Sequence, residues 1–422
     1  MTEARLEVPQ EGRDWANLLP DLVQEISDRL ISLDVAEYHR FRAVCRPWQR
    51  GSSTAGLLDS RFRPRNWMVL SMNHEAEPHP HSYLLNLVTA ASLDVHLPAL
   101  STHCHIGAAD GLLVLFHKPT KTIRLLDPLT NAVTQFPAVS DTSGDRAYSP
   151  GPPKVINGAA FDDSTSPPTL IIFAKPGDEH WTLVSPGQIS YPVYNSHRKV
   201  LFYTLLSLGG RCYVSSPEGS VYLFELQPLP RLVEVVDQRR FAEKDYIWRN
   251  HIISLLVRGT GGWMLMVRCW RGVEHFAGFE SYNPSEIFTL AHGMTFRIEV
   301  LEVDIAGNRL VPVTSLGRHA LFLGLTHCLH ISTETFPSIS ADSIYLGHLH
   351  QQTNGFGIYH INNINGKANF RKTEAKHKFI TNIVTGDFTP DVRPPYNLDE
   401  HLVNYVDRSH KSSKPCMNHT SC

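Results

Sequence analysis

Beyond about residue 65, the sequence is a succession of short apolar runs separated by Gly, Pro, Asn, Asp and Ser. Each run is long enough for a β-strand and too short for a helix that would cover a sheet. No long helical periodicity interrupts the runs, which disfavours a parallel sheet with helical crossovers. We therefore predict that most of the chain is all-β.

The predicted strands share this apolar pattern, and turn residues bound most of them. They are Trp67–Met72, Leu112–Phe116, Ile123–Leu126, Leu170–Ala174, Val200–Leu205, Cys212–Ser215, Val221–Phe224, Leu232–Val236, Ile252–Val257, Trp263–Cys269, Phe296–Val303, Leu310–Val313, Leu321–Leu325, Ser343–Leu346 and Phe356–Ile361.

A weak repeat runs through these strands. Gly111, Gly210 and Gly262 each lead a strand, a turn and a second strand. The glycines are 99 and 52 residues apart, close to two copies and one copy of a unit of roughly 50 residues. That period lies in the range of four-stranded propeller blades, so we predict a β-propeller, with a stacked pair of β-sandwiches as the alternative.

The N-terminal part of the chain carries closely spaced helical signals instead. Pro20 suits the first turn of a helix, and Ser32 or Asp34 suits the N-cap of a second one. Pro47 would break a helix interior, so a third helix is predicted to begin around Cys45, with Pro47 in its first turn.

Three helices of this size are too few to bury all of their apolar side chains. Leu22, Val23, Ile26 and Leu30 recur at helical spacing and form one apolar stripe. We therefore expect some of these side chains to face a partner. The alternative is a helical cap that lies on the rest of the chain.

Charge and composition narrow the function. Lys+Arg total 39 against 41 Asp+Glu, a formal charge of -2, so neither nucleic acid nor an anionic membrane is an expected partner. No apolar run reaches the ~18 residues of a membrane span, and the polar start lacks the apolar stretch of a signal peptide. The seven scattered cysteines include no CxxC, which indicates free thiols in a reducing compartment.

No specific catalytic constellation is present, and we expect no catalytic residue and no cofactor. Gly259–Gly262 is glycine-rich but precedes a strand, which predicts a tight β-turn and not a phosphate-binding loop. Asp162 and Asp163 lie in a Ser/Pro-rich stretch that favours a solvated loop. The strongest metal candidates are His103-Cys104-His105 and His327-Cys328-Leu329-His330; no known zinc spacing links them, so ordinary strand and loop histidines are preferred.

The segment DWANLLPDLVQEISDRLISLDVAEYHRFRAVCRPWQRGSS resembles an F-box. It has Leu-Pro at its start, the helical spacing of the apolar stripe, and then RAVCR followed by Trp; its departure is Tyr38-His39, where two aliphatic residues are more usual. In that family these positions form a helical module that binds the Skp adaptor of a cullin–RING ubiquitin ligase. The resemblance implies contact or core roles for Leu19, Pro20, Leu22, Ile26, Leu30, Val44, Cys45 and Trp48.

The rest of the chain is similar to plant F-box proteins with a KIB-type β-propeller domain. Gly111–Pro137, Leu301–Leu325, Phe336–Leu346 and Gly357–Ile361 carry this resemblance. It implies a small all-α N-terminal F-box followed by a large all-β domain. The expected boundaries are 1–12 disordered, 13–55 F-box, 62–400 propeller and 401–422 a disordered basic tail.

The resemblance implies a non-catalytic substrate receptor of an SCF-type (Skp–cullin–F-box) ubiquitin ligase in the cytoplasm, the nucleus or both. Its expected partners are a Skp-type adaptor, cullin through that adaptor, and a target protein. Two other functions stay open: a stoichiometric binding protein that transfers no ubiquitin, and a propeller-type enzyme.

Overall fold

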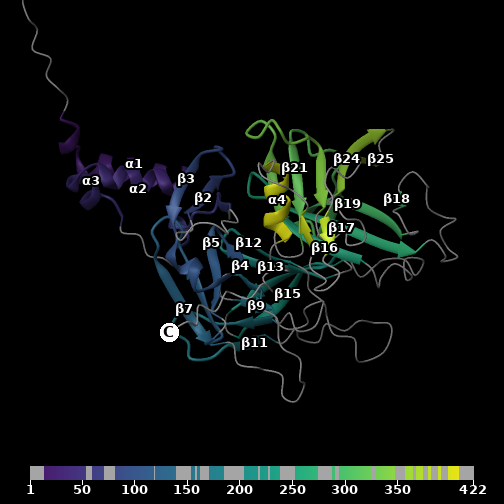
Figure 1. Cartoon of the computed structure of the whole chain (residues 1–422), viewed down its shortest axis with the longest axis horizontal. Coiled ribbons are helices and arrows are strands. Elements are labelled where there is room, and N and C mark those ends of the chain that lie inside the picture. Colours follow the sequence, from purple (N-terminus) through teal and green to yellow (C-terminus); the bar gives the residue numbers. More distant parts are fainter. Residues whose placement is uncertain are drawn as a thin grey trace, which may run out of the picture. The chain divides into compact units, whose positions relative to one another are not determined.

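The chain forms two compact units, Met1–Pro64 and Arg65–Cys422, which we call the helical unit and the β unit and describe separately (Figure 1). The computed structural model describes residues 14–53, 59–70, 81–117, 119–138, 154–156, 159–161, 171–184, 204–216, 219–226, 229–237, 252–273, 288–289, 294–324, 328–346, 357–364, 367–373, 379–381, 388–390 and 398–407.

The helical unit contains the three helices that the sequence predicts. They are α1 (Pro20–Leu33), α2 (Val35–Val44) and α3 (Arg46–Gly51), with 3-10 turns η1 (Trp15–Asn17) and η2 (Ser60–Phe62). Pro20 opens α1, where a missing N–H costs no helical hydrogen bond. The Asp34 side chain caps α2 by accepting a hydrogen bond from the Ala36 N–H at 2.9 Å. Pro47 lies in the first turn of α3, as predicted.

The core of the helical unit is built around Tyr38, which is fully buried. Its ring centroid lies 5.3 Å from that of Phe62, and Ile31 belongs to the same cluster. The Tyr38 hydroxyl donates a hydrogen bond to the carbonyl of Ser53, so its polar end is satisfied. The unit thus completes a small core of its own.

The β unit consists of mostly antiparallel sheets that follow one another along the chain. Its first strands are β1 (Trp67–Leu70), β2 (His81–Asn86), β3 (Ser92–His96), β4 (Cys104–Ala109), β5 (Leu112–His117), β6 (Thr122–Leu126), β7 (Val133–Ala138), β8 (Lys154–Ile156), β9 (Ala159–Phe161), β10 (Ile171–Phe173), β11 (Thr182–Val184), β12 (Leu205–Leu208), β13 (Arg211–Ser215), β14 (Val221–Glu225) and β15 (Arg231–Val236). A 3-10 turn, η3 (Pro98–Ser101), precedes β4.

The second half of the unit continues in the same way. Its strands are β16 (Ile252–Arg258), β17 (Met264–Val273), β18 (Phe288–Thr289), β19 (Met294–Asp304), β20 (Arg309–Pro312), β21 (His319–Leu323), β22 (Cys328–Ser332), β23 (Ser343–Leu346), β24 (Gly357–Ile364), β25 (Lys367–Thr373), β26 (Phe379–Thr381) and β27 (Phe388–Pro390), and they are followed by α4 (Leu398–Asp407).

Within the described residues, five sheets have four or five strands: β4–β7, β8–β11, β12–β15, β16–β20 and β21–β25. Figure 1 shows them in chain order, from blue through teal to green. Sheets made of consecutive strands are typical of propeller blades, whereas stacked β-sandwiches exchange strands between two facing sheets. The arrangement therefore favours the propeller.

The repeated glycines occupy equivalent hairpins. Gly111 lies between β4 and β5, Gly210 between β12 and β13, and Gly262 between β16 and β17. Their φ angles are 84°, 75° and 81°, a left-handed backbone that glycine adopts without a steric penalty. The sequence repeat thus marks the turn between the first two strands of a sheet.

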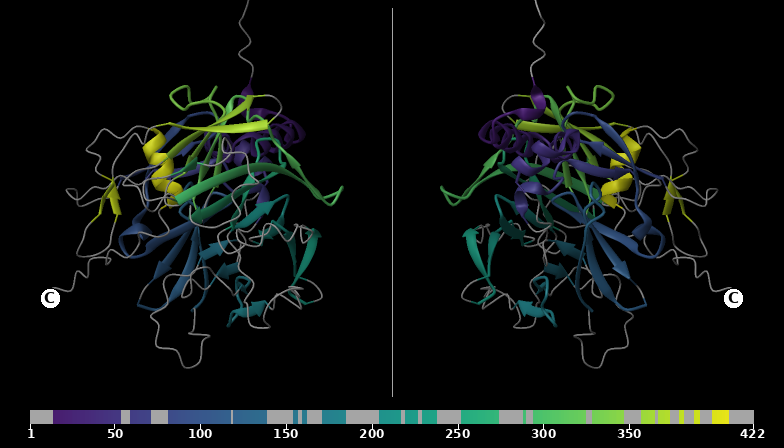
Figure 2. Two further views of the ribbon diagram at one scale, coloured as in Figure 1. Left: turned by 90° about the vertical axis from the view of Figure 1, so that its right-hand side faces the viewer. Right: turned by 90° about the vertical axis from the view of Figure 1, so that its left-hand side faces the viewer.

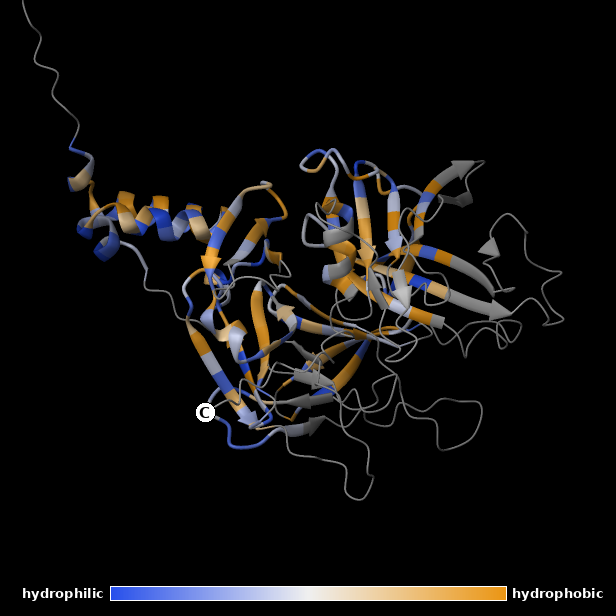
Figure 3. Cartoon of the chain, viewed as in Figure 1, coloured by the Kyte–Doolittle hydropathy of each residue, from blue (hydrophilic) through white to orange (hydrophobic). Residues whose placement is uncertain are grey.

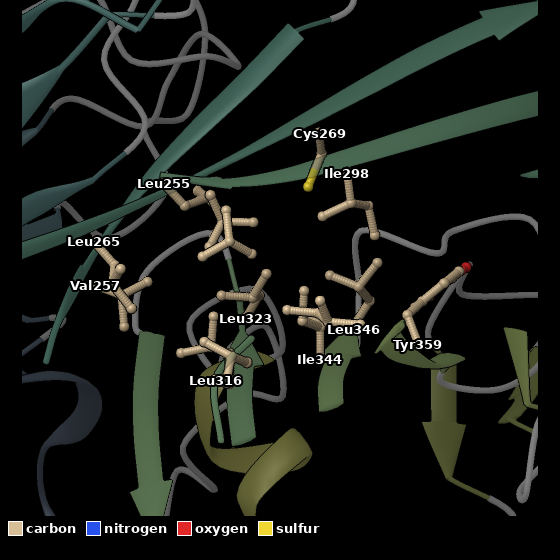
Figure 4. Packing of buried hydrophobic residues seen from close by; sticks show 14 of the residues in the cluster. Leu255, Val257, Leu265, Cys269, Ile298, Leu316, Leu323, Ile344, Leu346 and Tyr359 are labelled. Carbon is tan, nitrogen blue, oxygen red and sulfur yellow. The ribbon is translucent and has the colours of Figure 1, made fainter. Parts of the chain in front are cut away.

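The β16–β20 sheet is buried on both faces. Leu255 packs in one cluster with Leu323 and Ile344 of the β21–β25 sheet (Figure 4). Its neighbour Leu256 points to the opposite face and packs in a second cluster with Tyr213 of the β12–β15 sheet. Burial of one sheet between the preceding and the following sheet is the packing of a propeller blade.

The β1–β3 and β21–β25 sheets share a core with α4. Met68 from β1, Phe322 from β21 and Leu402 from α4 belong to one buried cluster. Gly324, directly after β21, lets α4 approach closely, because a Cβ there would overlap the carbonyl oxygen of Val406. Figure 2 shows α4 (yellow) beside the strands of the β21–β25 sheet (green).

Two observations differ from the sequence expectation. The β unit contains α4, so it is mostly and not wholly β; the sequence analysis placed residues 401–407 of this helix in an unstructured tail. β12 begins at Leu205, where the predicted strand Val200–Leu205 ends.

Residues 1–13 and 408–422 lie outside the described residues. No helix in the described parts is long and apolar enough to cross a membrane.

Candidate functional site

None of the eight residues expected at an adaptor surface is buried. Leu19, Leu22 and Val44 are 68%, 47% and 64% exposed. Figure 3 shows hydrophobic residues (orange) interspersed with hydrophilic ones (blue) along these helices. The exposed members of the set are Leu19, Pro20, Leu22 and Val44, and the half-buried ones are Ile26, Leu30, Cys45 and Trp48.

Trp48 links three parts of the helical unit. Its ring stacks on Phe41 of α2 with centroids 4.5 Å apart, and its Nε1 donates a hydrogen bond to the Trp15 carbonyl at 2.9 Å. These contacts bring together α3, the C-terminal part of α2 and the turn that precedes α1. Trp15 is itself 59% exposed and was missed by the sequence analysis, although it stands four residues before Leu19.

Other residues of the helical unit belong to its core. Leu30 packs against the cluster of Ile31, Tyr38 and Phe62. Tyr38, part of the departure from the usual F-box pattern, is buried at the centre of that cluster and not on the exposed surface. The aromatic residue at this position is therefore part of the core.

The first metal candidate has local partners. The His103 ring lies 4.9 Å from that of His117, and its Nδ1 is 2.8 Å from Thr102 Oγ1 and 3.2 Å from the Ala99 carbonyl oxygen. Burial lowers the pKa of His103, and the nearby charge of Arg124 adds to this shift. In the part of the chain that the structure describes, no group of three or more His, Cys, Asp or Glu side chains is placed to hold a metal ion.

The residues of the second metal candidate lie in different surroundings. The Cys328 Sγ lies 3.5 Å from the Gly324 carbonyl oxygen, and His330 faces a pocket described below. His327 of this candidate lies outside the described residues, as do the two carboxylates Asp162 and Asp163.

The β unit contains a pocket of about 650 Å³. Its wall is built from β1, β12, β16 and β22, from the β4–β5 and β16–β17 turns, and from Tyr405 of α4. This volume lies in the range of protein ligand sites. No sequence pattern predicts the pocket, because its wall comes from segments far apart in the chain.

A histidine pair lies on this wall. The rings of His319 and His330 stack with centroids 4.5 Å apart. The Thr260 N–H donates to His330 Nδ1 at 3.1 Å, and Thr260 Oγ1 lies 3.3 Å from His319 Nε2. Trp263 meets His330 edge-on at 5.8 Å. The Gly259–Gly262 segment forms the predicted tight turn, and Thr260 ties it to the β21–β22 hairpin.

Burial lowers the pKa of His330 to about 4, and the neighbouring His319 contributes to the shift. His330 is therefore neutral at pH 7. The pocket wall also holds Arg258 and Asp110, and the Asp110 carboxylate accepts a hydrogen bond from Ser207 Oγ at 3.3 Å. The pocket can thus bind polar groups through side chains of both charges.

Comparisons with known proteins match this architecture. The family described as KIB1-4 beta-propeller matches residues 49–360. An Arabidopsis thaliana protein named as a "Putative F-box protein" is 29% identical over 73 residues, which are 17% of this chain and 32% of the relative. The chain thus matches only about a third of the length of that relative.

The β-propeller domain of Cps50 (Swd1) from Myceliophteria thermophila is a structural match that covers 73% of this chain and 93% of that domain, at 9% identity. Its TM-score of 0.27 is too low to support an argument. The family match, in contrast, spans about three quarters of the chain and nearly all the sheets described above. The chain belongs to the KIB1-4 β-propeller family.

Proposed function

We propose that the chain is the substrate-receptor subunit of an SCF-type ubiquitin ligase. The helical unit binds a Skp-type adaptor and, through it, cullin, and the β unit binds a target protein. The chain itself catalyses no reaction and needs no cofactor; it raises the effective concentration of target lysines near the ubiquitin carrier. We place this activity in the cytoplasm, the nucleus or both.

The exposure of Leu19, Leu22 and Val44 carries the proposal. The helical unit fills its own core with Tyr38 and its neighbours, so these three side chains are not needed there. Several exposed apolar side chains on one small unit are typical of a protein-binding surface. The name of the Arabidopsis relative and the F-box pattern of the segment support a Skp-type adaptor as the partner.

The structure determines which residues to change in a test. Trp48 and Ile26 are half-buried, and Trp48 holds α3 in place, so their substitution would also perturb the fold. Leu19→Ala/Leu22→Ala removes exposed side chains only. Central apolar anchors of an interface contribute about 2 kcal/mol or more each, so the double variant should bind purified Skp adaptor at least about tenfold more weakly.

Isothermal titration of the full chain with the adaptor measures this effect. Leu229→Ala is the matched control, because Leu229 is an equally exposed leucine in the β unit. It should bind the adaptor as the wild type does. Wild-type affinity in the Leu19→Ala/Leu22→Ala variant, with an unchanged circular dichroism spectrum, would show that the adaptor uses another surface.

Ubiquitin transfer needs its own test, because adaptor binding alone is compatible with a stoichiometric regulator. The half-life of a captured target should lengthen in cells that express the Leu19→Ala/Leu22→Ala variant, and a proteasome inhibitor should abolish the difference. A target whose half-life changes neither with the variant nor with the proteasome inhibitor would favour the stoichiometric regulator.

A further inference from the structure

The pocket of the β unit presents a cation that no described residue pairs with. Arg258 stands at the end of β16, lines the pocket and is half-buried. Its backbone pairs with Met264 in the sheet, but within the described residues its side chain forms no hydrogen bond and no ion pair. A guanidinium group has five N–H donors and no acceptor, so Arg258 offers the pocket a charge and several unused donors.

His330 presents a further donor on the same wall. Its Nδ1 accepts the Thr260 N–H, so the proton of the neutral ring lies on Nε2. No residue that the structure describes accepts a hydrogen bond from this Nε2. The ring is neutral at pH 7 and carries a single proton, so the hydrogen bond from Thr260 fixes its tautomer. Thr260 follows Arg258 by two residues.

The donors of Arg258 and His330 determine which functional group a ligand must have. The carboxylate of Asp110 also lines the pocket, but it already accepts the hydroxyl of Ser207. A group that satisfies both Arg258 and His330 must therefore be an acceptor, and a negative charge would pair with the guanidinium. The wall holds two arginines, Arg65 and Arg258, and one carboxylate, Asp110, a formal balance of one positive charge. A phosphate carries nearly twice the charge of a carboxylate, so a singly charged carboxylate matches this balance better.

The surroundings of these donors favour a protein ligand. Val88 lines the pocket and Trp263 packs on His330, and both are exposed. Tyr405 also lines the pocket. Arg, Trp and Tyr near an apolar patch are the residues that dominate the binding energy of protein interfaces.

We propose that this pocket binds an Asp or Glu carboxylate in an acidic segment of a partner protein, which pairs with Arg258 and accepts a hydrogen bond from His330 Nε2. Apolar residues of the same segment contact Val88 and Trp263. The inference rests on the proposed function of the β unit in binding a target, and it specifies the chemistry of that target.

A peptide array tests the proposal on the full chain. Random short peptides are presented in matched sets that differ at one central position, which is Glu, Gln, phosphoserine or Lys. Glu peptides should bind at least about tenfold more tightly than their Gln and Lys counterparts. Arg258→Gln should abolish this preference, and Arg258→Glu should shift it towards Lys. His330→Phe keeps an aromatic ring and should weaken Glu peptides several-fold without affecting Lys peptides, which have no acceptor at this position.

Arg231→Gln is the matched control, since Arg231 is a more exposed arginine that pairs with Glu225 away from the pocket. It should retain the preference for Glu, and all variants should keep the thermal unfolding profile of the wild type. Equal binding of Glu and Gln peptides, no binding of any peptide, or an unchanged preference in Arg258→Gln would overturn the proposal. Tighter binding of phosphoserine than of Glu, or complete displacement by inorganic phosphate at low concentration, would overturn the choice of a protein carboxylate.

Adaptor binding separates this inference from the proposed function. Arg258→Gln should bind the Skp adaptor normally, because Arg258 lies in the β unit. If the wild type binds the adaptor but shows no preference for Glu, the carboxylate pocket is wrong and the proposed function stands. If Arg258 selects Glu peptides in a chain that binds no adaptor, the pocket stands and the proposed function is wrong.

Discussion

Arg268 of β17 and Glu299 of β19 form an ion pair across adjacent strands, with Nη2 and Oε2 2.9 Å apart. The Arg268 side chain is almost completely buried, whereas Glu299 retains some exposure. The turn at Gly219 covers the arginine, since a Cβ there would lie 3.3 Å from Arg268 Cδ. The pair thus joins two neighbouring strands of the β16–β20 sheet, on the face that the β13–β14 turn covers.

Glu299→Leu should lower the free energy of unfolding by about 3 kcal/mol, because it removes a charge partner of a buried guanidinium. Arg268→Met/Glu299→Leu should recover most of that loss, since the uncompensated charge is gone. Urea unfolding of the single and double variants gives the coupling energy. Additive effects of the two substitutions would show that the pair contributes no coupling.

Trp48→Ala should loosen α3. The change removes the stacking on Phe41 and the hydrogen bond to the Trp15 carbonyl, which together contribute roughly 2 kcal/mol. Hydrogen exchange measured by mass spectrometry should then be faster in peptides that cover Arg46–Gly51. Trp48→Phe keeps the stacking and should recover part of the protection. Equal exchange in all three proteins would mean that other contacts hold α3.

Gly324→Ala should displace α4, because its methyl group would overlap the Val406 carbonyl. We expect a loss of several kcal/mol and faster proteolysis near the C-terminal helix. Gly317→Ala is the control: its φ is 59° and nothing lies within 4 Å, so backbone strain alone should cost about 1 kcal/mol. The two effects on thermal unfolding should therefore differ clearly. Similar small losses would imply that α4 adjusts without cost.

The pH dependence of stability should contain a contribution from His330. Its pKa is about 4 in the folded protein against an ordinary value of 6.5, so between these values the unfolded chain binds a proton that the folded chain does not. The stabilising contribution is complete above pH 6.5 and declines as the pH falls towards 4. One proton gives a slope of at most ~1.4 kcal/mol per pH unit.

His330→Gln isolates this contribution, because an amide can accept the Thr260 N–H but does not titrate. Urea unfolding of both proteins at several pH values should give a difference in stability that diminishes from pH 6.5 downwards. Parallel pH profiles would mean that His330 titrates alike in the folded and unfolded chains.

Local chemistry explains why some elements could be predicted. Pro20, Asp34 and Pro47 determine helix starts through their own backbone and side-chain properties, so no tertiary contact is needed to locate them. Gly111, Gly210 and Gly262 likewise mark hairpins, since each has a positive φ. The strand of Ile252–Val257 could be predicted because both of its faces are buried, which makes the run apolar except for Ser254.

Other elements depend on contacts that sequence patterns do not contain. β4 has a register shift between His105 and Gly107, which interrupts the strand alternation. α4 has only ten residues, a length that is marginal for an isolated helix, and it is stabilised by the cluster around Leu402. Arg258 and His330 lie 72 positions apart, and only the arrangement of sheets places them on one pocket wall.

The contact of α4 with the β1–β3 and β21–β25 sheets has a consequence for biosynthesis. Leu402 and Val406 close a cluster that contains Met68, so this part of the core is completed only by residues far downstream in the chain. During translation, the Met68 side chain therefore stays uncovered until the ribosome has passed position 406. A messenger RNA with a premature stop codon before position 402 would yield a product that chaperones retain or proteases remove.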